Sequence, residues 1–300
     1  MRLGLGINTC FAVKRWPRVA DWAPIVRDQL GLRVVQHSFD LVDVALDDPA
    51  VLRADMAGLD LELHSTFTGL AAYSSNLLLH PDGTARAAAE AWYRAAIAWT
   101  AAAGGGATGG HVGAFSVADW TDRSTRDERW TALHGALDRL AVDARVAGLD
   151  HLLVENLAAA REPSTVAMIR DLVTDGDDDR APVRLCLDVG HMCVPGAGGS
   201  ERDPYAWARE VGRLATVVQL QQSDADGDHH WPFTRTRNAQ GRIDADRLID
   251  ALGEGGVDTC CLILEIIPAF EQPDDEVLRD LGASVDYWRD ALDRRGVSAA

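Results

Sequence analysis

The chain has 300 residues, 47% of them hydrophobic, and it carries a formal net charge of −17 at pH 7. This size and apolar content are enough for one large core, so we expect a single domain over residues 1–300. An acidic chain repels polyanions at long range, which excludes nucleic acid and anionic membrane surfaces as expected partners.

Apolar segments with a strand-like pattern recur along the chain, and most of the segments between them are typical of helices. Strands are predicted over residues 2–8, 33–37, 59–64, 107–112, 151–155, 184–188, 215–221 and 260–266. Long helices are predicted over 84–103 and 127–147, a short one within 47–58, a long loop over 65–81 and a low-complexity tail over 297–300. This alternation predicts an α/β protein built as a single (β/α)8 TIM barrel.

A doubly wound parallel sheet is the alternative fold. Such a sheet would need a glycine-rich phosphate-binding turn after the first strand. Gly4 and Gly6 lie inside that strand, and no third glycine opens a helix behind them. The dinucleotide-binding fingerprint is therefore absent, which favours the barrel.

The cysteines and the start of the chain indicate a soluble protein of the cytoplasm. The five cysteines show no Cys-x-x-Cys spacing, and their odd number favours reduced thiols. No signal peptide is expected at the start, and no apolar run reaches the length of a membrane span. Lys14 is the only lysine, which argues against a Schiff-base mechanism.

Acidic side chains stand where several predicted strands end. Glu155 closes the fifth strand, Asp188 the sixth, and Glu265 lies near the end of the eighth. In an α/β barrel these ends meet at one face, where the active site lies. Each acid alone could cap a helix or pair with an arginine. Three converging carboxylates, however, need a cation to stay ionised, so together they predict a divalent-metal site.

Other polar residues follow the strands at the same face. Arg235 and Arg237 could clamp a substrate phosphate, or they could balance neighbouring acids. His64 and His111 could contact substrate hydroxyls, although a single histidine at a strand end is often structural. The segment 228–238 is rich in recognition side chains, and its candidate substrate-binding residues are His229, His230 and Trp231.

Several of these motifs together resemble the xylose isomerase-like TIM barrels, which include ketose 3-epimerases, sugar-phosphate isomerases and inosose dehydratases. They are Glu155 in LLVENL, Asp188 and His191 in LDVGH, the seventh-strand segment, and Glu265 in LILEI. The resemblance implies that Glu155, Asp188 and Glu265 bind a divalent metal, that Glu155 and Glu265 also act as acid and base, and that His191 orients a substrate hydroxyl. It also implies that copies of the chain could associate into a homo-oligomer.

The seventh strand departs from the family pattern. The family's metal-binding histidine usually stands three residues before an acid, and here that position is Gln221. An amide oxygen as fourth ligand would favour Mn²⁺ or Mg²⁺ over Zn²⁺. The alternative is that Gln221 is not a ligand and that His229 or His230 replaces it.

The resemblance implies proton abstraction beside a carbonyl, with the metal stabilising an enediolate. We therefore expect a sugar isomerase or epimerase of carbohydrate metabolism, acting on a small ketose or ketose phosphate. The HHWPFT segment is similar to the erythrulose-phosphate epimerase branch. The alternatives are a lyase related to inosose dehydratases or carbon-glycoside cleaving enzymes, an endonuclease-four-like phosphodiesterase, which the acidic charge disfavours, and an inactive sugar-binding barrel.

Overall fold

The structure is a computed structural model, and it describes residues 1–297. Within these residues the strands are β1 (Arg2–Asn8), β2 (Val34–Ser38), β3 (Glu62–Phe67), β4 (Ala107–Gly110), β5 (His151–Glu155), β6 (Val183–Asp188), β7 (Ala215–Leu220) and β8 (Thr259–Leu264). They follow the chain order in a closed barrel. The predicted (β/α)8 fold is confirmed, and most of the predicted tail lies outside the described residues.

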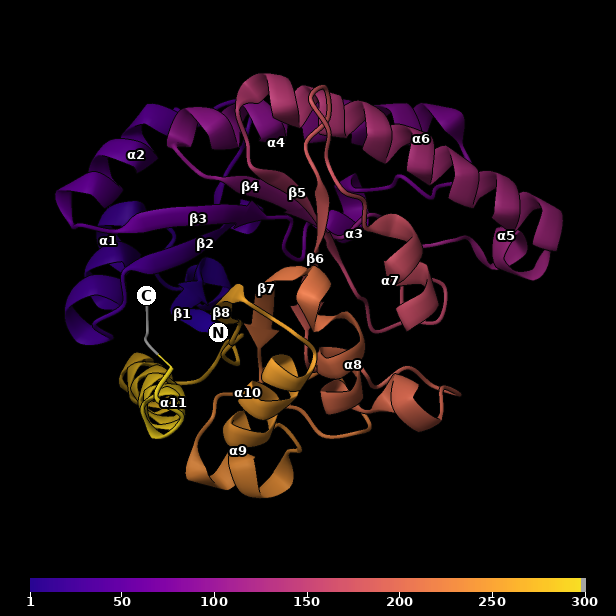
Figure 1. The fold of residues 1–300 in the computed structure, drawn as a ribbon. Coiled ribbons are helices and arrows are strands. Elements are labelled where there is room, and N and C mark those ends of the chain that lie inside the picture. The colour runs from indigo at the N-terminus through magenta and orange to yellow at the C-terminus, as the bar shows by residue number, and fades with distance from the viewer. Residues whose placement is uncertain (298–300) are drawn as a thin grey trace. The chain divides into compact units, whose positions relative to one another are not determined.

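Helices stand between the strands, as predicted (Figure 1). They are α1 (Val19–Pro24), α2 (Pro49–Gly58), α3 (Ala72–Ser75), α4 (Gly83–Ala103), α5 (Val117–Thr121), α6 (Arg123–Ala147), α7 (Val166–Leu172), α8 (Pro204–Val211), α9 (Arg235–Gln240), α10 (Ala245–Glu254) and α11 (Asp274–Arg294). Short 3-10 turns occupy Thr9–Ala12, Phe39–Leu41, Gly199–Arg202 and Gly212–Leu214, and a π-helical turn occupies Ile25–Gln29. No described helix is both long and apolar enough to cross a lipid bilayer.

The two long predicted helices have clear local causes. Asp82 caps α4 by accepting a hydrogen bond from the Thr84 N–H at 2.8 Å, and Gly104 ends it in the left-handed conformation at φ 88°. Asp122 caps α6, so this helix begins four residues before the predicted start at residue 127. The cap explains the error, because apolar periodicity alone does not mark a polar first turn.

The chain divides into two compact units. The first comprises Met1–Gln36, Asp55–Glu62 and the chain from Cys186 onward. In it, β1 pairs in parallel with β8, so that Leu3 stands opposite Cys260 and Leu5 opposite Leu262. Helix α10 packs against α8 and α11 (Figure 1). Trp207 and Trp288 on these helices are almost completely buried. The apolar faces of these helices therefore supply the core of this unit.

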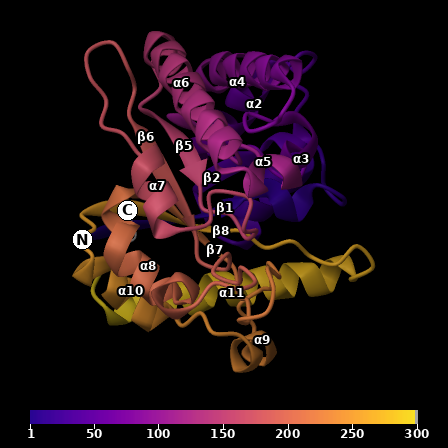
Figure 2. The same cartoon turned by 90° about the vertical axis from the view of Figure 1, so that its right-hand side faces the viewer.

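The second unit comprises His37–Ala54 and Leu63–Leu185. Its long helices α4 and α6 lie side by side (Figure 2). Strand β4 pairs with β5, and both backbones approach closely at Gly109, which has φ 144°. A Cβ atom there would lie 2.0 Å from the carbonyl oxygen of Leu153, so only glycine fits. The glycine pair at the end of β4 also explains why the strand ends before His111.

Candidate active site

Asp188 is the last residue of β6 and is completely buried. Its Oδ1 accepts a hydrogen bond from the Gly190 N–H at 2.6 Å, which turns the chain toward His191. A Cβ atom on Gly190 would lie 2.3 Å from the Gln221 Cδ, so a larger residue there would displace the Gln221 amide. The Asp-x-Gly-His motif is therefore a turn built to place a carboxylate and an imidazole together.

Asp188, His191 and His230 form a group that could hold a metal ion. Each offers one ligand atom, and these atoms all lie within 4.8 Å of one another. The Nε2 of His191 is 3.7 Å from Asp188 Oδ2. His230 adopts φ 49°, which is uncommon for a residue other than glycine and marks a constrained position. Carboxylate and imidazole donors in such a group suit a divalent transition metal.

The amide of Gln221 has a defined orientation. Its Oε1 accepts a hydrogen bond from the backbone N–H of His230 at 2.6 Å, so its Nε2 must point the other way. That Nε2 lies 3.1 Å from both carboxylate oxygens of Asp188. An amide nitrogen is a donor and does not bind a metal, which favours His230 over Gln221 as the fourth ligand.

His229 faces away from this group. Its Nε2 lies 3.0 Å from Asp224 Oδ1, and its ring stacks on Trp231 at 3.9 Å with an interplanar angle of 2°. The guanidinium of Arg237 stacks on the same Trp231 ring at 4.3 Å and donates to Gln240. Trp231 therefore lies between a histidine and an arginine, which limits how far either can turn.

Asp228 was not among the predicted site residues, although it opens the segment 228–238. One carboxylate oxygen lies 2.7 Å from the Gln221 Nε2 and 3.2 Å from the His230 Nε2. The other lies 3.2 Å from the His191 Nε2. Burial alone would raise the pKa of Asp228, but the two imidazoles hold it below its ordinary value. Burial alone would lower the pKa of His230, but the carboxylate of Asp228 raises it above its ordinary value.

Glu265 directly follows β8, and buried amides hold one of its oxygens. Its Oε1 accepts hydrogen bonds from Asn8 Nδ2 at 3.2 Å and Gln219 Nε2 at 3.0 Å. Both amides also donate to Gln36 Oε1 at 2.9 Å. The other oxygen, Oε2, lies 3.7 Å from the His230 Nδ1. These three amides were not predicted as site residues, because each looks like an ordinary strand residue in the sequence.

Of the four predicted ligands, the first unit brings together Asp188, Gln221 and Glu265, while Glu155 belongs to the second unit. Glu155 is the last residue of β5 and is 5% exposed. Within its own unit it acts on Tyr93, whose pKa is raised chiefly by burial and further by the charge of Glu155. Glu155 is therefore a buried acid at a strand end, as predicted.

The remaining predicted contacts have partners of their own. The Nδ1 of His111 accepts from the Gly113 N–H at 3.1 Å, and its Nε2 lies 3.5 Å from Glu162 Oε1. His64 is half-buried, with its Nδ1 3.1 Å from the Ser65 Oγ. Arg235 is the exposed first residue of α9. The roles of these residues in substrate binding stay predictions.

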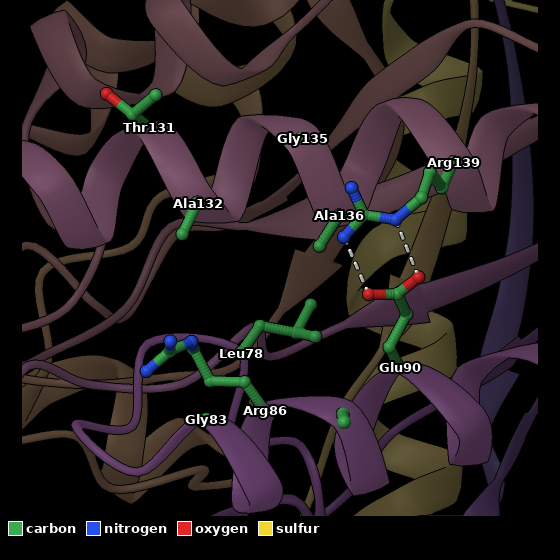
Figure 3. A pocket seen from close by; sticks show the side chains of 10 residues that line it. Leu78, Gly83, Arg86, Glu90, Thr131, Ala132, Gly135, Ala136 and Arg139 are labelled. Carbon is green, nitrogen blue, oxygen red and sulfur yellow. Dashed lines mark hydrogen bonds and ion pairs between the residues drawn. The ribbon is translucent and has the colours of Figure 1, made fainter.

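A pocket of about 450 Å³ opens between the outer helices α4 and α6 (Figure 3). Small residues and three charged side chains line it, among them Ala132, Ala136, Arg86 and the ion pair of Glu90 with Arg139. None of the predicted site residues lines this pocket. It is thus a feature of the helical layer and separate from the strand ends that carry the candidate site.

Comparisons with known proteins agree with the barrel fold. The family model for the xylose isomerase-like TIM barrel matches residues 28–291. The D-erythrulose 1-phosphate 3-epimerase of Brucella abortus (strain 2308) is 28% identical over 306 residues, which cover 98% of this chain and 97% of that protein.

Solved structures are similar over nearly the whole chain. A structure from Rhodospirillum rubrum, described as a candidate xylose isomerase, is 33% identical with a TM-score of 0.87, and the match covers 96% of this chain and 99% of that one. An L-ribulose 3-epimerase has a TM-score of 0.69 at 22% identity, with 99% and 97% of the two chains covered. The second likeness shows the fold alone.

Proposed function

The chain belongs to the xylose isomerase-like TIM-barrel family and is an enzyme of the isomerase class. From this premise we propose that it is a divalent-metal-dependent 3-epimerase of a small ketose phosphate. The relative from Brucella abortus, named for D-erythrulose 1-phosphate, supports a four-carbon substrate with a phosphate group. Cytoplasmic carbohydrate metabolism is part of the proposal. The five cysteines, all free thiols, are consistent with a reducing compartment.

The observation that carries the proposal is the donor group at the strand ends of the first unit. Asp188, His191 and His230 offer ligand atoms within 4.8 Å of one another, and the Glu265 carboxylate adjoins His230. We propose that Asp188, His230 and Glu265 bind the ion together with Glu155, since the carboxyl ends of barrel strands share one face. Carboxylates with one imidazole favour Mn²⁺, and Mg²⁺ is the alternative.

The chemistry follows from these donors. A bound divalent ion would stabilise negative charge that develops on the substrate's carbonyl oxygen. Glu265 and Glu155 would move the proton at the carbon beside the carbonyl, one removing it from one side and the other returning it from the opposite side. The hydrogen bonds from Asn8 and Gln219 occupy Glu265 Oε1, so Oε2 would be the oxygen that accepts and returns the proton. His191 would orient a substrate hydroxyl.

Proton exchange in D₂O tests this function. The protein, loaded with Mn²⁺ or Mg²⁺, is incubated with D-erythrulose 1-phosphate and other four- to six-carbon ketoses and their phosphates, and deuterium incorporation is followed by NMR. We expect deuterium beside the carbonyl with at least one of them, and a loss of about 10²-fold or more in Glu155→Gln and Glu265→Gln.

Glu271→Gln, a change of an exposed acid beyond β8, is the matched control and should exchange at the wild-type rate. Absence of exchange with every sugar while metal still binds would contradict the epimerase. Release of water or of another leaving group, in place of exchange, would assign the chain to the lyases of the same family.

A further inference from the structure

Arg242 lies in the connection from β7 to α10, beside the candidate site. The backbone N–H of Arg242 donates to the Ser223 carbonyl oxygen at 3.0 Å, and the Arg242 carbonyl oxygen accepts a hydrogen bond from Tyr205 Oη at 2.6 Å. Its Nη1 donates to the carbonyl oxygen of Arg202 at 2.7 Å. The guanidinium is thus held between the segments that follow β6 and β7.

The other edge of this guanidinium has no hydrogen-bond partner among residues 1–297. Nε and Nη2 of Arg242 are buried, and neither donates a hydrogen bond to any described residue. No described acid forms an ion pair with it. Burial lowers the pKa of Arg242 and the nearby guanidinium of Arg202 adds to that effect, while the charges of Cys193, Asp203 and Asp224 act in the opposite direction. Two buried donors without hydrogen-bond partners are costly, and on a cationic group they favour an anion.

The same edge binds carboxylates elsewhere in this protein. Arg139 donates from Nε and Nη2 to the two oxygens of Glu90, both at 2.8 Å (Figure 3). Other arginines with a carboxylate on this edge are Arg18, Arg180, Arg294 and Arg295. Two parallel N–H groups match two oxygens of a carboxylate or a phosphate. The Nε and Nη2 edge of Arg242, called the fork below, therefore offers the same pair of donors to an anion.

Short contacts connect the backbone of Arg242 to the candidate site. Ser223, which accepts from the Arg242 backbone, donates from its Oγ to Gln221 Oε1 at 2.7 Å. Gln221 in turn contacts Asp188 at 3.1 Å. Cys193 lies two residues beyond His191 in the chain. Burial chiefly raises the pKa of its thiol and the charge of Asp228 raises it further, while the charges of His191 and Arg242 lower it.

We propose that the Nε and Nη2 edge of Arg242 binds the phosphate group of the substrate. This inference rests on the proposed function and makes it more specific, since it assigns the preference for a phosphate monoester to one residue. Arg237 is already stacked on Trp231 and Arg235 is exposed, so neither offers a buried fork. Because the two donors are covered, the residues over them must shift when the phosphate enters.

Binding of inorganic phosphate tests the fork without reference to activity. Titration calorimetry on the metal-loaded protein compares the wild type with Arg242→Gln, Arg242→Lys and a control, Arg213→Gln, which changes an exposed arginine before β7. We expect Arg242→Gln to weaken phosphate binding about 10- to 100-fold, and Arg242→Lys to weaken it less, because it keeps the charge but not the fork. Arg213→Gln should change it less than twofold. Wild-type affinity in Arg242→Gln overturns the proposal.

Kinetics with D-erythrulose 1-phosphate and unphosphorylated D-erythrulose separate this proposal from the function itself. In Arg242→Gln, or in Arg242→Lys if the first variant does not fold, KM should rise for the phosphate while kcat/KM for the free sugar stays unchanged. An equal loss of kcat/KM for both sugars would show that Arg242 does not recognise the phosphate group. If no sugar exchanges deuterium but phosphate binding still depends on Arg242, the anion site stands and the epimerase function fails.

Discussion

At the scale of single residues, Asp228 connects the imidazoles of His191 and His230 through its two oxygens, at 3.2 Å each. Acids that hold metal-binding histidines fix the ring orientation and raise the basicity of the ligand. We expect Asp228→Asn to weaken Mn²⁺ binding about 10- to 100-fold, measured by electron paramagnetic resonance of the free ion. Asp226→Asn, which changes an exposed acid of the same loop, is the control. Equal Mn²⁺ affinity of both variants would show that Asp228 does not support the metal site.

At the scale of elements, the pairing of β4 with β5 depends on a glycine. Gly109→Ala would place a Cβ atom 2.0 Å from the Leu153 carbonyl oxygen at φ 144°. We expect it to lower the free energy of unfolding by about 3 kcal/mol or more, because overpacking adds to backbone strain. Gly282→Ala in α11 meets nothing within 4 Å and should raise it by about 0.5–1 kcal/mol. Urea denaturation compares the two variants. A loss of less than about 3 kcal/mol in Gly109→Ala would contradict the close approach of the two backbones.

At the scale of the whole molecule, the proposed metal should stabilise the folded chain. Mn²⁺ at 100 times its Kd adds about 2.7 kcal/mol to the free energy of unfolding if the ion binds only the folded state. Denaturation with and without Mn²⁺ measures this gain. Asp188→Asn should abolish most of it, while Asp286→Asn, on the exposed surface of α11, should keep it. A full gain in Asp188→Asn would show that the ion binds elsewhere.

The whole chain also bears on the single-domain prediction. The family model spans residues 28–291 and so includes parts of both compact units. This supports one domain over residues 1–300, which stays a prediction. A single cooperative unfolding transition, seen alike by far-ultraviolet circular dichroism and tryptophan fluorescence, is what one domain would give.

The local pattern of the sequence was sufficient for the fold and for the position of the candidate acids at the strand ends. Strand periodicity, helix caps and the order of the elements are properties of neighbouring residues, so they can be read along the chain. Asp188, Glu155 and Glu265 were predicted because each stands at or directly beyond the end of an apolar strand. The Asp-x-Gly-His turn was recognisable for the same reason.

Only the tertiary structure decided how the polar groups of the site pair. The orientation of Gln221 depends on a backbone N–H nine residues further on, and the role of Asp228 depends on two histidines from different loops. The amides around Glu265 come from three separate strands. Apolar periodicity reports which way a side chain faces, but a hydrogen bond depends on atoms that folding brings within about 3 Å of each other, whatever their separation in the chain.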